Sequence, residues 1–197
     1  MTDAPLIVRW PEALAFWLAY AWAFYPEWRL NRRARPGGEG APDAGSCRAI
    51  VRGNAVATLI ACLVAFAAPG AAMRAHREAI FWAGVAVLVL GSVLRRHCFR
   101  VLGEHFTYEV RAAPDQPVIE RGAYRWVRHP SYTAGVLLFA GIGLALTNWL
   151  SLAILLLVPS ALYAYRVAVE ERALATTIGA PYRDYMRRTK RFVPYLF

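Results

Sequence analysis

The chain has 197 residues, 58% of them hydrophobic, and a formal net charge of +10. Soluble domains are about 45–50% apolar, whereas the charged residues here gather in three segments separated by long uncharged runs. This distribution argues against nucleic acid as a partner. It predicts a single all-α integral-membrane domain over residues 1–197, surrounded by lipids.

The first half of the chain contains three apolar runs. Run 13–25 is rich in aromatic residues but short for a span, although 6–10 extends it if the flanking charges lie among the headgroups. Run 53–73 is uncharged over 21 residues and is the clearest span, and run 79–94 follows a short polar turn. The Pro- and Gly-rich residues 36–42 predict a flexible loop.

The longest apolar run, 130–165, predicts a helical hairpin. As one helix of 36 residues it would be roughly 54 Å long, well beyond a hydrocarbon core of about 30 Å. Thr147 and Asn148 near its middle predict the break, and Pro159 is expected to kink the second arm. Further on, residues 179–181 are expected to end one helix and start another.

These runs give five spans, and the charge distribution supports that number. The polar segments 26–52, 95–129 and 166–197 would share one membrane face and carry 20 of the 23 basic residues. The positive-inside rule places such a face in the cytoplasm. We therefore expect a multi-pass protein of the inner or cell membrane with its N-terminus outside and its C-terminus cytoplasmic. A single span in place of the hairpin would put the C-terminal segment on the wrong face.

The cysteines and the chain ends predict little chemistry. Cys47, Cys62 and Cys98 form neither a disulfide framework nor a zinc pattern. His97 and Cys98 with His105 are the best metal candidates, but their spacing is weak, so we expect no metal. The start has no basic region typical of a signal peptide and the end has no prenylation box, so neither is expected.

The densest basic motif lies just before the hairpin. Residues 121–129 contain three arginines and a histidine, and ionisable groups other than tyrosine then disappear until residue 166. Pro130 fits the first turn of a helix. His129 would therefore lie at the positive helix end, next to backbone N–H groups and the Arg128 guanidinium, and form an anion-binding corner. The alternative is a basic stop at the edge of a membrane helix.

A second polar group follows the hairpin and would return to the same membrane face. Arg166 and Glu170 are four residues apart on one side of a helix, and Glu171 points about a quarter turn away. Ionisable residues at a membrane edge are costly unless they function or pair. We expect a polar cavity open to lipid and cytosol. The alternative is an Arg166–Glu170 ion pair worth a few tenths of a kcal/mol.

Together these motifs resemble the isoprenylcysteine carboxyl methyltransferase family. The resemblance covers about residues 95–197, which would form the catalytic part, whereas 1–94 match only in being membrane spans. It rests on Gly122-Ala123-Tyr124, Arg128-His129-Pro130-Ser131-Tyr132, Glu170-Glu171, Leu174, Gly179, Tyr182 and Tyr185, and Phe106-Thr107 and Val118-Ile119 fit the same pattern.

The resemblance implies an integral-membrane methyltransferase that uses S-adenosyl-L-methionine and takes a lipophilic carboxylate from the bilayer. Arg166 would hold the acceptor carboxylate and, with Glu170, form the catalytic pair. The chain has Gln116 where the family often has His, and Ala134 where it has Gly, with Gly135 one residue late. On this analogy the cofactor would be bound by Gln116, Pro117, Val118, Ile119, Tyr124, His129, Pro130, Ser131, Tyr132, Glu170 and Glu171.

The chemistry of these side chains agrees with that cofactor. Glu170 can meet its cationic part, the helix start at His129 can meet its carboxylate, and aromatic faces suit an adenine or a sulfonium. Methyl transfer is an in-line displacement that mainly requires positioning. Three alternatives stay open: a phospholipid N-methyltransferase, an NADPH-dependent membrane enzyme like the sterol reductases, and a scaffold without enzymatic activity. The absence of a Gly-x-Gly-x-x-Gly loop disfavours the dinucleotide.

Overall fold

The computed structural model describes residues 4–33, 45–103, 106 and 116–192, and this part of the chain is helical, with no regular strand. The all-α fold class is therefore confirmed. The long helices are α1 (Glu12–Arg33), α2 (Ser46–Ala67), α3 (Arg77–Leu102), α4 (Pro130–Ala145) and α5 (Trp149–Thr177). The shorter elements are η1 (Leu6–Val8), η2 (Pro69–Ala71), η4 (Gly122–Arg125) and α6 (Ala180–Arg188).

Three described helices, α2, α3 and α5, are long and apolar enough to cross a membrane. Helix α4 is also apolar but has 16 residues, and α1 occupies the place of the first expected span. A helix therefore stands at each of the five predicted spans, while the number that crosses the bilayer stays a prediction.

The predicted hairpin is confirmed at the predicted position. Helix α4 ends at Ala145 and α5 begins at Trp149, and between them Thr147 adopts a left-handed φ of 51°. The Asn148 side chain accepts hydrogen bonds from the N–H groups of Leu150 and Ser151 and so caps α5. Its amide also donates to the Ala68 carbonyl at 3.0 Å, which fastens the turn to the end of α2.

Several predicted boundaries were wrong. The second span was expected over 53–73, but α2 begins seven residues earlier and ends before Pro69, which cannot continue a helix. Helix α3 extends beyond the third apolar run, 79–94, as far as Leu102, because its arginines find partners at the helix surface. Arg96 lies over the Trp22 ring at 4.2 Å, and Arg95 donates to the Ser131 carbonyl at 2.7 Å. Helix α5 contains Pro159 in its interior, and the kink expected there stays a prediction.

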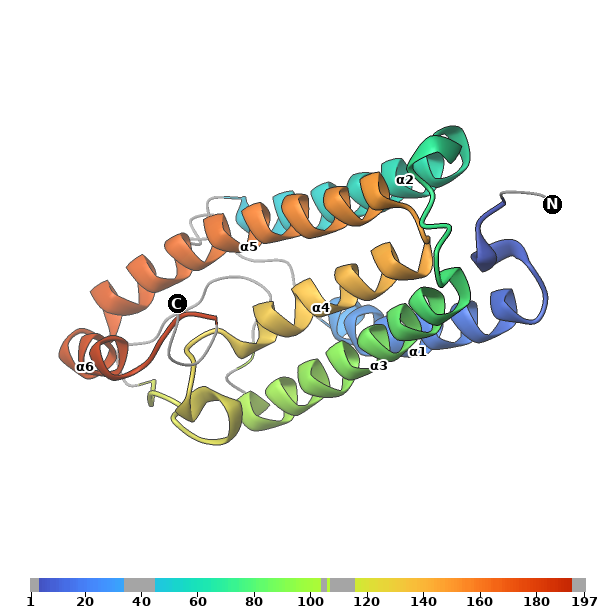
Figure 1. Cartoon of the computed structure of the whole chain (residues 1–197). Helices are drawn as coiled ribbons and strands as arrows, with labels where there is room; N and C mark the ends of the chain where they lie inside the picture. The colour runs from blue at the N-terminus through green and yellow to red at the C-terminus, as the bar shows by residue number, and fades with distance from the viewer. Residues whose placement is uncertain (1–3, 34–44, 104–105, 107–115, 193–197) are drawn as a thin grey trace.

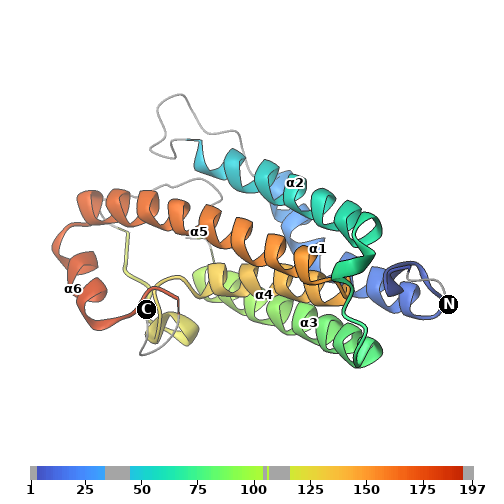
Figure 2. The ribbon, with the colours of Figure 1, turned by 45° about the horizontal axis from the view of Figure 1, so that its top comes forward.

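The helices pack around α4, which lies between α3 and α5, while α2 runs along α5 and α1 lies on α3 (Figures 1 and 2). Close approach of α3 and α4 depends on glycine. A Cβ atom on Gly141 would lie 2.5 Å from the Leu88 nitrogen, and one on Gly84 would lie 2.8 Å from the Gly141 carbonyl oxygen. Helix α6 and the segment before α4 gather at one end of the bundle, far from η1 (Figure 1).

Candidate active site

The segment leading into α4 is held by residues that follow α6. The N–H groups of Arg128 and His129 donate to the carbonyls of Lys190 and Arg191 at 2.8 and 2.9 Å. The Thr133 hydroxyl donates to the Phe192 carbonyl at 2.8 Å. The last described residues of the chain therefore lie along the entry of the helix that begins at Pro130.

The predicted anion-binding corner contacts a carboxylate of the chain itself. Glu171, buried at the end of α5, accepts from Arg128 Nε at 2.9 Å and from Arg191 Nη2 at 2.7 Å. His129 Nε2 lies 3.2 Å from the same carboxylate. The bonds to Glu171 raise the pKa of the Arg191 guanidinium above its ordinary value. Glu171 thus joins α5, the entry of α4 and the C-terminal segment.

The neighbouring Glu170 points elsewhere and belongs to a second chain of contacts. The Tyr132 hydroxyl donates to Glu170 Oε2 at 2.8 Å and accepts from Arg166 Nε at 3.3 Å. Arg166 Nη1 donates to the Ser46 hydroxyl oxygen at 2.5 Å. Arg166 and Glu170 share one face of α5, as predicted, and Tyr132 bridges them.

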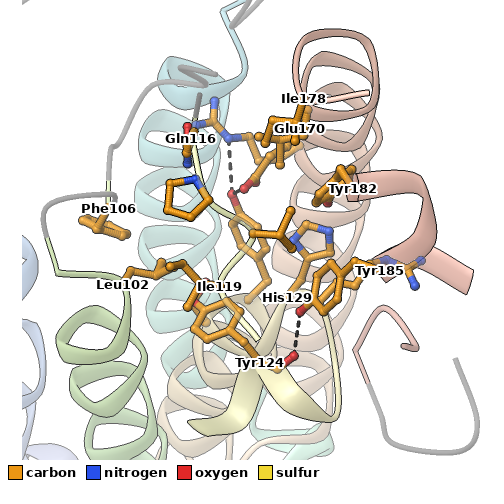
Figure 3. Close-up of a pocket in the computed structure, with 17 residues that line it drawn as sticks. Leu102, Phe106, Gln116, Ile119, Tyr124, His129, Glu170, Ile178, Tyr182 and Tyr185 are labelled. Carbon is orange, nitrogen blue, oxygen red and sulfur yellow. Dashed lines mark hydrogen bonds between the residues drawn. The ribbon is translucent and has the colours of Figure 1, made fainter. Parts of the chain in front are cut away.

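A cavity of about 120 Å³ adjoins this chain of contacts, since Tyr132, Arg166 and Glu170 are part of its lining (Figure 3). Tyr182 and Tyr185 reach toward it from α6, opposite Leu102 and Phe106 (Figure 3). Burial raises the pKa of the Tyr124, Tyr182 and Tyr185 hydroxyls well above the ordinary value, so these groups stay protonated.

The structure brings most of the predicted cofactor residues to this one cavity. Pro130 and Glu171 are the two that lie outside its lining. Pro130 forms the first turn of α4, and Glu171 is occupied by its cationic partners. The predicted residues that line the cavity are Gln116, Pro117, Val118, Ile119, Tyr124, His129, Ser131, Tyr132, Arg166 and Glu170.

Other lining residues were missed as site residues by the sequence prediction. Leu174 and Ile178 continue the four-residue spacing of Arg166 and Glu170 along one face of α5. That periodicity was the signal that would have found them. Leu102, at the end of α3, belongs to no sequence motif and lines the cavity only because of how the helices pack.

A larger cavity of about 590 Å³ adjoins the first. The two share the side chains of Phe106, Ser131, Tyr132 and Arg166. Most of its wall is apolar, and its lining comprises Tyr20, Phe24, Trp28, Cys47, Ile50, Val51, Asn54, Ala55, Thr58, Leu59, Cys62, Arg95, Phe106, Ser131, Tyr132, Leu138, Phe139, Tyr163 and Arg166. Arg166 and Tyr132 thus lie between a polar and an apolar cavity.

The weak metal candidate gains no support. Within the described ranges, no group of three His, Cys, Asp or Glu side chains could hold a metal ion. His97 lies beside Gly122, and Cys98 is fully buried. His105, the third candidate ligand, lies outside the described residues, as does Thr107 of the sequence motif.

Comparisons with known proteins find similarity to one family of methyltransferases. Residues 84–176 match the model of the isoprenylcysteine carboxyl methyltransferase (ICMT) family. Protein-S-isoprenylcysteine O-methyltransferases of Tribolium castaneum and Saccharomyces cerevisiae are 29% and 30% identical over 115 residues. These alignments cover 57% of this chain and 41% and 48% of the relatives, so the chain spans about half the length of the curated relatives it matches.

A solved structure is also similar. The structure of the eukaryotic intramembrane Ras methyltransferase ICMT matches with a TM-score of 0.61 and 26% sequence identity, over 72% of this chain and 51% of that one. The apolar helices and these matches agree on a multi-pass integral membrane protein. The segment 84–176, which carries much of the candidate site, is thus similar in sequence to the isoprenylcysteine carboxyl methyltransferase family, and the fold is similar to that of a solved member.

Proposed function

We propose that the chain methylates the carboxylate of a lipophilic acceptor, an isoprenylcysteine or a similar lipid-linked acid, with S-adenosyl-L-methionine as donor. The observation that carries the proposal is the position of Arg166. Its buried guanidinium lines both the small polar cavity and the large apolar one. An acceptor with an apolar tail and an anionic end fits this boundary.

The apolar cavity supports a lipid tail. Its volume of about 590 Å³ lies within the range of about 300–1,000 Å³ that is typical of ligand pockets. Tyr20, Phe24, Leu59 and Phe139 present aromatic and aliphatic surface to it. A hydrocarbon tail can move into this apolar cavity from the bilayer at little cost, because both surroundings are apolar, so the cavity accommodates the tail while the polar end supplies specificity.

Arg166 supports a carboxylate as the reacting group. A carboxylate that leaves water for a buried site needs a paired charge, and guanidinium can bind it through two parallel N–H···O bonds. The carboxylate is already ionised at neutral pH, so it needs no general base. An ammonium acceptor would need one and would be repelled by Arg166, which disfavours the phospholipid N-methyltransferase alternative.

The residues of the small cavity fit the donor by charge and shape. The Glu170 carboxylate, held by Tyr132, can bind a cationic group, and the faces of Tyr124, Tyr182 and Tyr185 can bind a flat base. When bound, S-adenosyl-L-methionine supplies a methyl group on a cationic sulfonium. The cavity of about 120 Å³ is smaller than a typical ligand pocket of about 300–1,000 Å³, so we expect its lining to widen on binding.

The membrane orientation belongs to the same proposal. The charge distribution favours the N-terminus outside and the C-terminus in the cytoplasm of a cell or inner membrane. Reporter fusions at Asn148 and after Phe197 are then expected to lie on opposite sides. Finding both on one side would contradict the topology, since the hairpin turn and α6 lie at opposite ends of the bundle (Figure 1).

A panel of acceptors tests the function. The purified protein in lipid nanodiscs is incubated with methyl-labelled S-adenosyl-L-methionine and, separately, N-acetyl-S-farnesylcysteine, its methyl ester, or phosphatidylethanolamine. We expect label on the free acid and none on the other two acceptors. Label on phosphatidylethanolamine alone would establish the N-methyltransferase alternative instead.

A further inference from the structure

Ser46, the first residue of α2, contacts the candidate substrate-binding arginine across 120 positions of sequence. Its hydroxyl oxygen accepts from Arg166 Nη1 at 2.5 Å, and both residues are buried, with 0% and 3% of their surface exposed. Ser46 lies outside residues 84–176, the segment that matches the family. The N-terminal helices therefore contribute a polar group to the site.

The position of Ser46 is fixed by the packing of α2 along α5. Gly45 turns the chain into α2 with a left-handed φ of 72°. One face of α2 then approaches α5 closely, because a Cβ atom on Gly53 would lie 2.7 Å from Leu162 Cδ1. Near the other end of the pair, the Ser151 hydroxyl donates to the Ala61 carbonyl at 2.7 Å. Contacts at both ends set the register, which places the first turn of α2 beside Arg166.

The contacts of Arg166 restrict the orientation of its guanidinium plane. Tyr132 accepts from Nε at 3.3 Å, and Ser46 accepts from Nη1 at 2.5 Å. Partners on two different nitrogens oppose rotation about the last bonds of the side chain. A two-point pair with a carboxylate depends on that orientation, because the guanidinium is a planar fork.

We propose that Ser46 is a positioning residue that aims the Arg166 guanidinium at the acceptor carboxylate. The inference rests on the proposed function, because it assigns Arg166 to the carboxylate. Without the Ser46 oxygen, Nη1 loses the contact at 2.5 Å, so one of the bonds that restrict the guanidinium plane is removed. The carboxylate of the acid then faces a guanidinium in the wrong orientation and binds more weakly. The affinity for an acceptor with no charge at that end is unaffected.

This role differs measurably from a purely structural one. If Ser46 only stabilised the bundle, its loss would lower thermal stability and weaken every ligand alike. A positioning role predicts a selective loss of the preference for the acid over its methyl ester. Ser92 offers a matched control, because it is also buried, lies next to α1 and accepts from Arg96 Nε at 3.3 Å, outside both cavities.

The test uses Ser46→Ala, Ser46→Thr and Ser92→Ala in the full chain in nanodiscs. Calorimetry measures the affinities for N-acetyl-S-farnesylcysteine and for its methyl ester, and activity assays measure KM and kcat. For Ser46→Ala we expect the acid-over-ester preference to fall about tenfold and KM for the acid to rise by a similar factor. Ser46→Thr, which keeps the hydroxyl, is expected to restore the preference. Affinity for S-adenosylhomocysteine is expected to change less than about twofold.

The binding measurement separates this inference from the proposed function. If the wild type prefers the acid but transfers no methyl group, the proposed reaction fails while the selective loss in Ser46→Ala still supports the role of Ser46. If Ser46→Ala keeps the wild-type acid-over-ester preference, the role of Ser46 is overturned. It is also overturned if Ser46→Ala and Ser92→Ala weaken acid and ester equally, or if the wild type itself does not distinguish acid from ester.

Discussion

The Glu171 carboxylate accepts a hydrogen bond from Arg128 Nε at 2.9 Å and so joins the end of α5 to the entry of α4. Both side chains are buried, with 5% and 8% of their surface exposed. Arg191 binds the other carboxylate oxygen, which adds the C-terminal segment to the same junction. The wall of the small cavity therefore depends on a carboxylate that does not line it.

Removal of this charge is expected to destabilise the protein strongly. Glu171→Gln leaves Arg128 buried without its anion, and loss of one partner from a buried pair costs about 3–5 kcal/mol. Asp184→Asn is the matched control, because its pair with Arg187 is exposed and such pairs are worth about 0–1 kcal/mol. Thermal unfolding in detergent is the measurement. Equal melting temperatures for the two variants would contradict the assigned role.

Glu170, one residue earlier, is expected to affect cofactor affinity more than stability. Glu170→Ala removes the carboxylate that Tyr132 holds in the small cavity. We expect the affinity for S-adenosylhomocysteine to fall at least about tenfold, which corresponds to about 1.4 kcal/mol. Glu120→Ala, which removes an exposed partner of Arg188, serves as control. Calorimetry that instead detects NADPH and no S-adenosylhomocysteine would favour the reductase alternative.

Arg166→Lys keeps the positive charge but loses the planar fork. The lysine ammonium cannot reproduce two parallel bonds to a carboxylate, and the contacts to Ser46 and Tyr132 change with it. We expect kcat/KM for the acid to fall by about 100-fold, equivalent to about 2.7 kcal/mol. Affinity for S-adenosylhomocysteine is expected to stay within about threefold. Wild-type kinetics in this variant would show that Arg166 takes no part in the reaction.

The pH dependence of the rate distinguishes the acceptors. An α-carboxyl group has a pKa of about 3.3–3.7, so between about pH 7 and 8.5 it stays ionised and reactive. Burial raises the pKa of Tyr124 and Tyr185, which therefore stay protonated across this range. A nearly flat rate profile is expected. An amine acceptor, which must lose a proton, would instead give a rate that rises about tenfold per pH unit.

The sequence predicted the elements whose signals are local. Thr147 and Asn148 interrupt an apolar run that is too long for one span, and Asn148 is the residue type that caps a helix. Arg166 and Glu170 share a helix face by spacing alone. The ends of α2 were wrong because the uncharged stretch 53–73 indicated which residues lie in lipid, whereas Gly45 and Pro69 decide where the helix begins and ends.

Contacts between distant segments could not be predicted in the same way. The bond between Ser46 and Arg166 depends on how α2 packs along α5, and no motif of either helix encodes that register. The partners of Glu171 could not be predicted from the sequence either, because Arg191 reaches it only after α6 turns the chain back toward α4. The sequence could therefore predict a carboxylate next to Glu170 but not the cationic side chains that bind it.

Formation of a methyl ester is the direct test of the proposed reaction. The wild-type chain in nanodiscs is incubated with methyl-labelled S-adenosyl-L-methionine and N-acetyl-S-farnesylcysteine, and the lipid product is then treated with mild alkali. Alkali is expected to release the label as volatile methanol, since the bond formed is a carboxyl ester, and Arg166→Ala is expected to give no such product. Absence of label from the acid with the wild-type chain, or label that resists alkali, would contradict the proposed reaction.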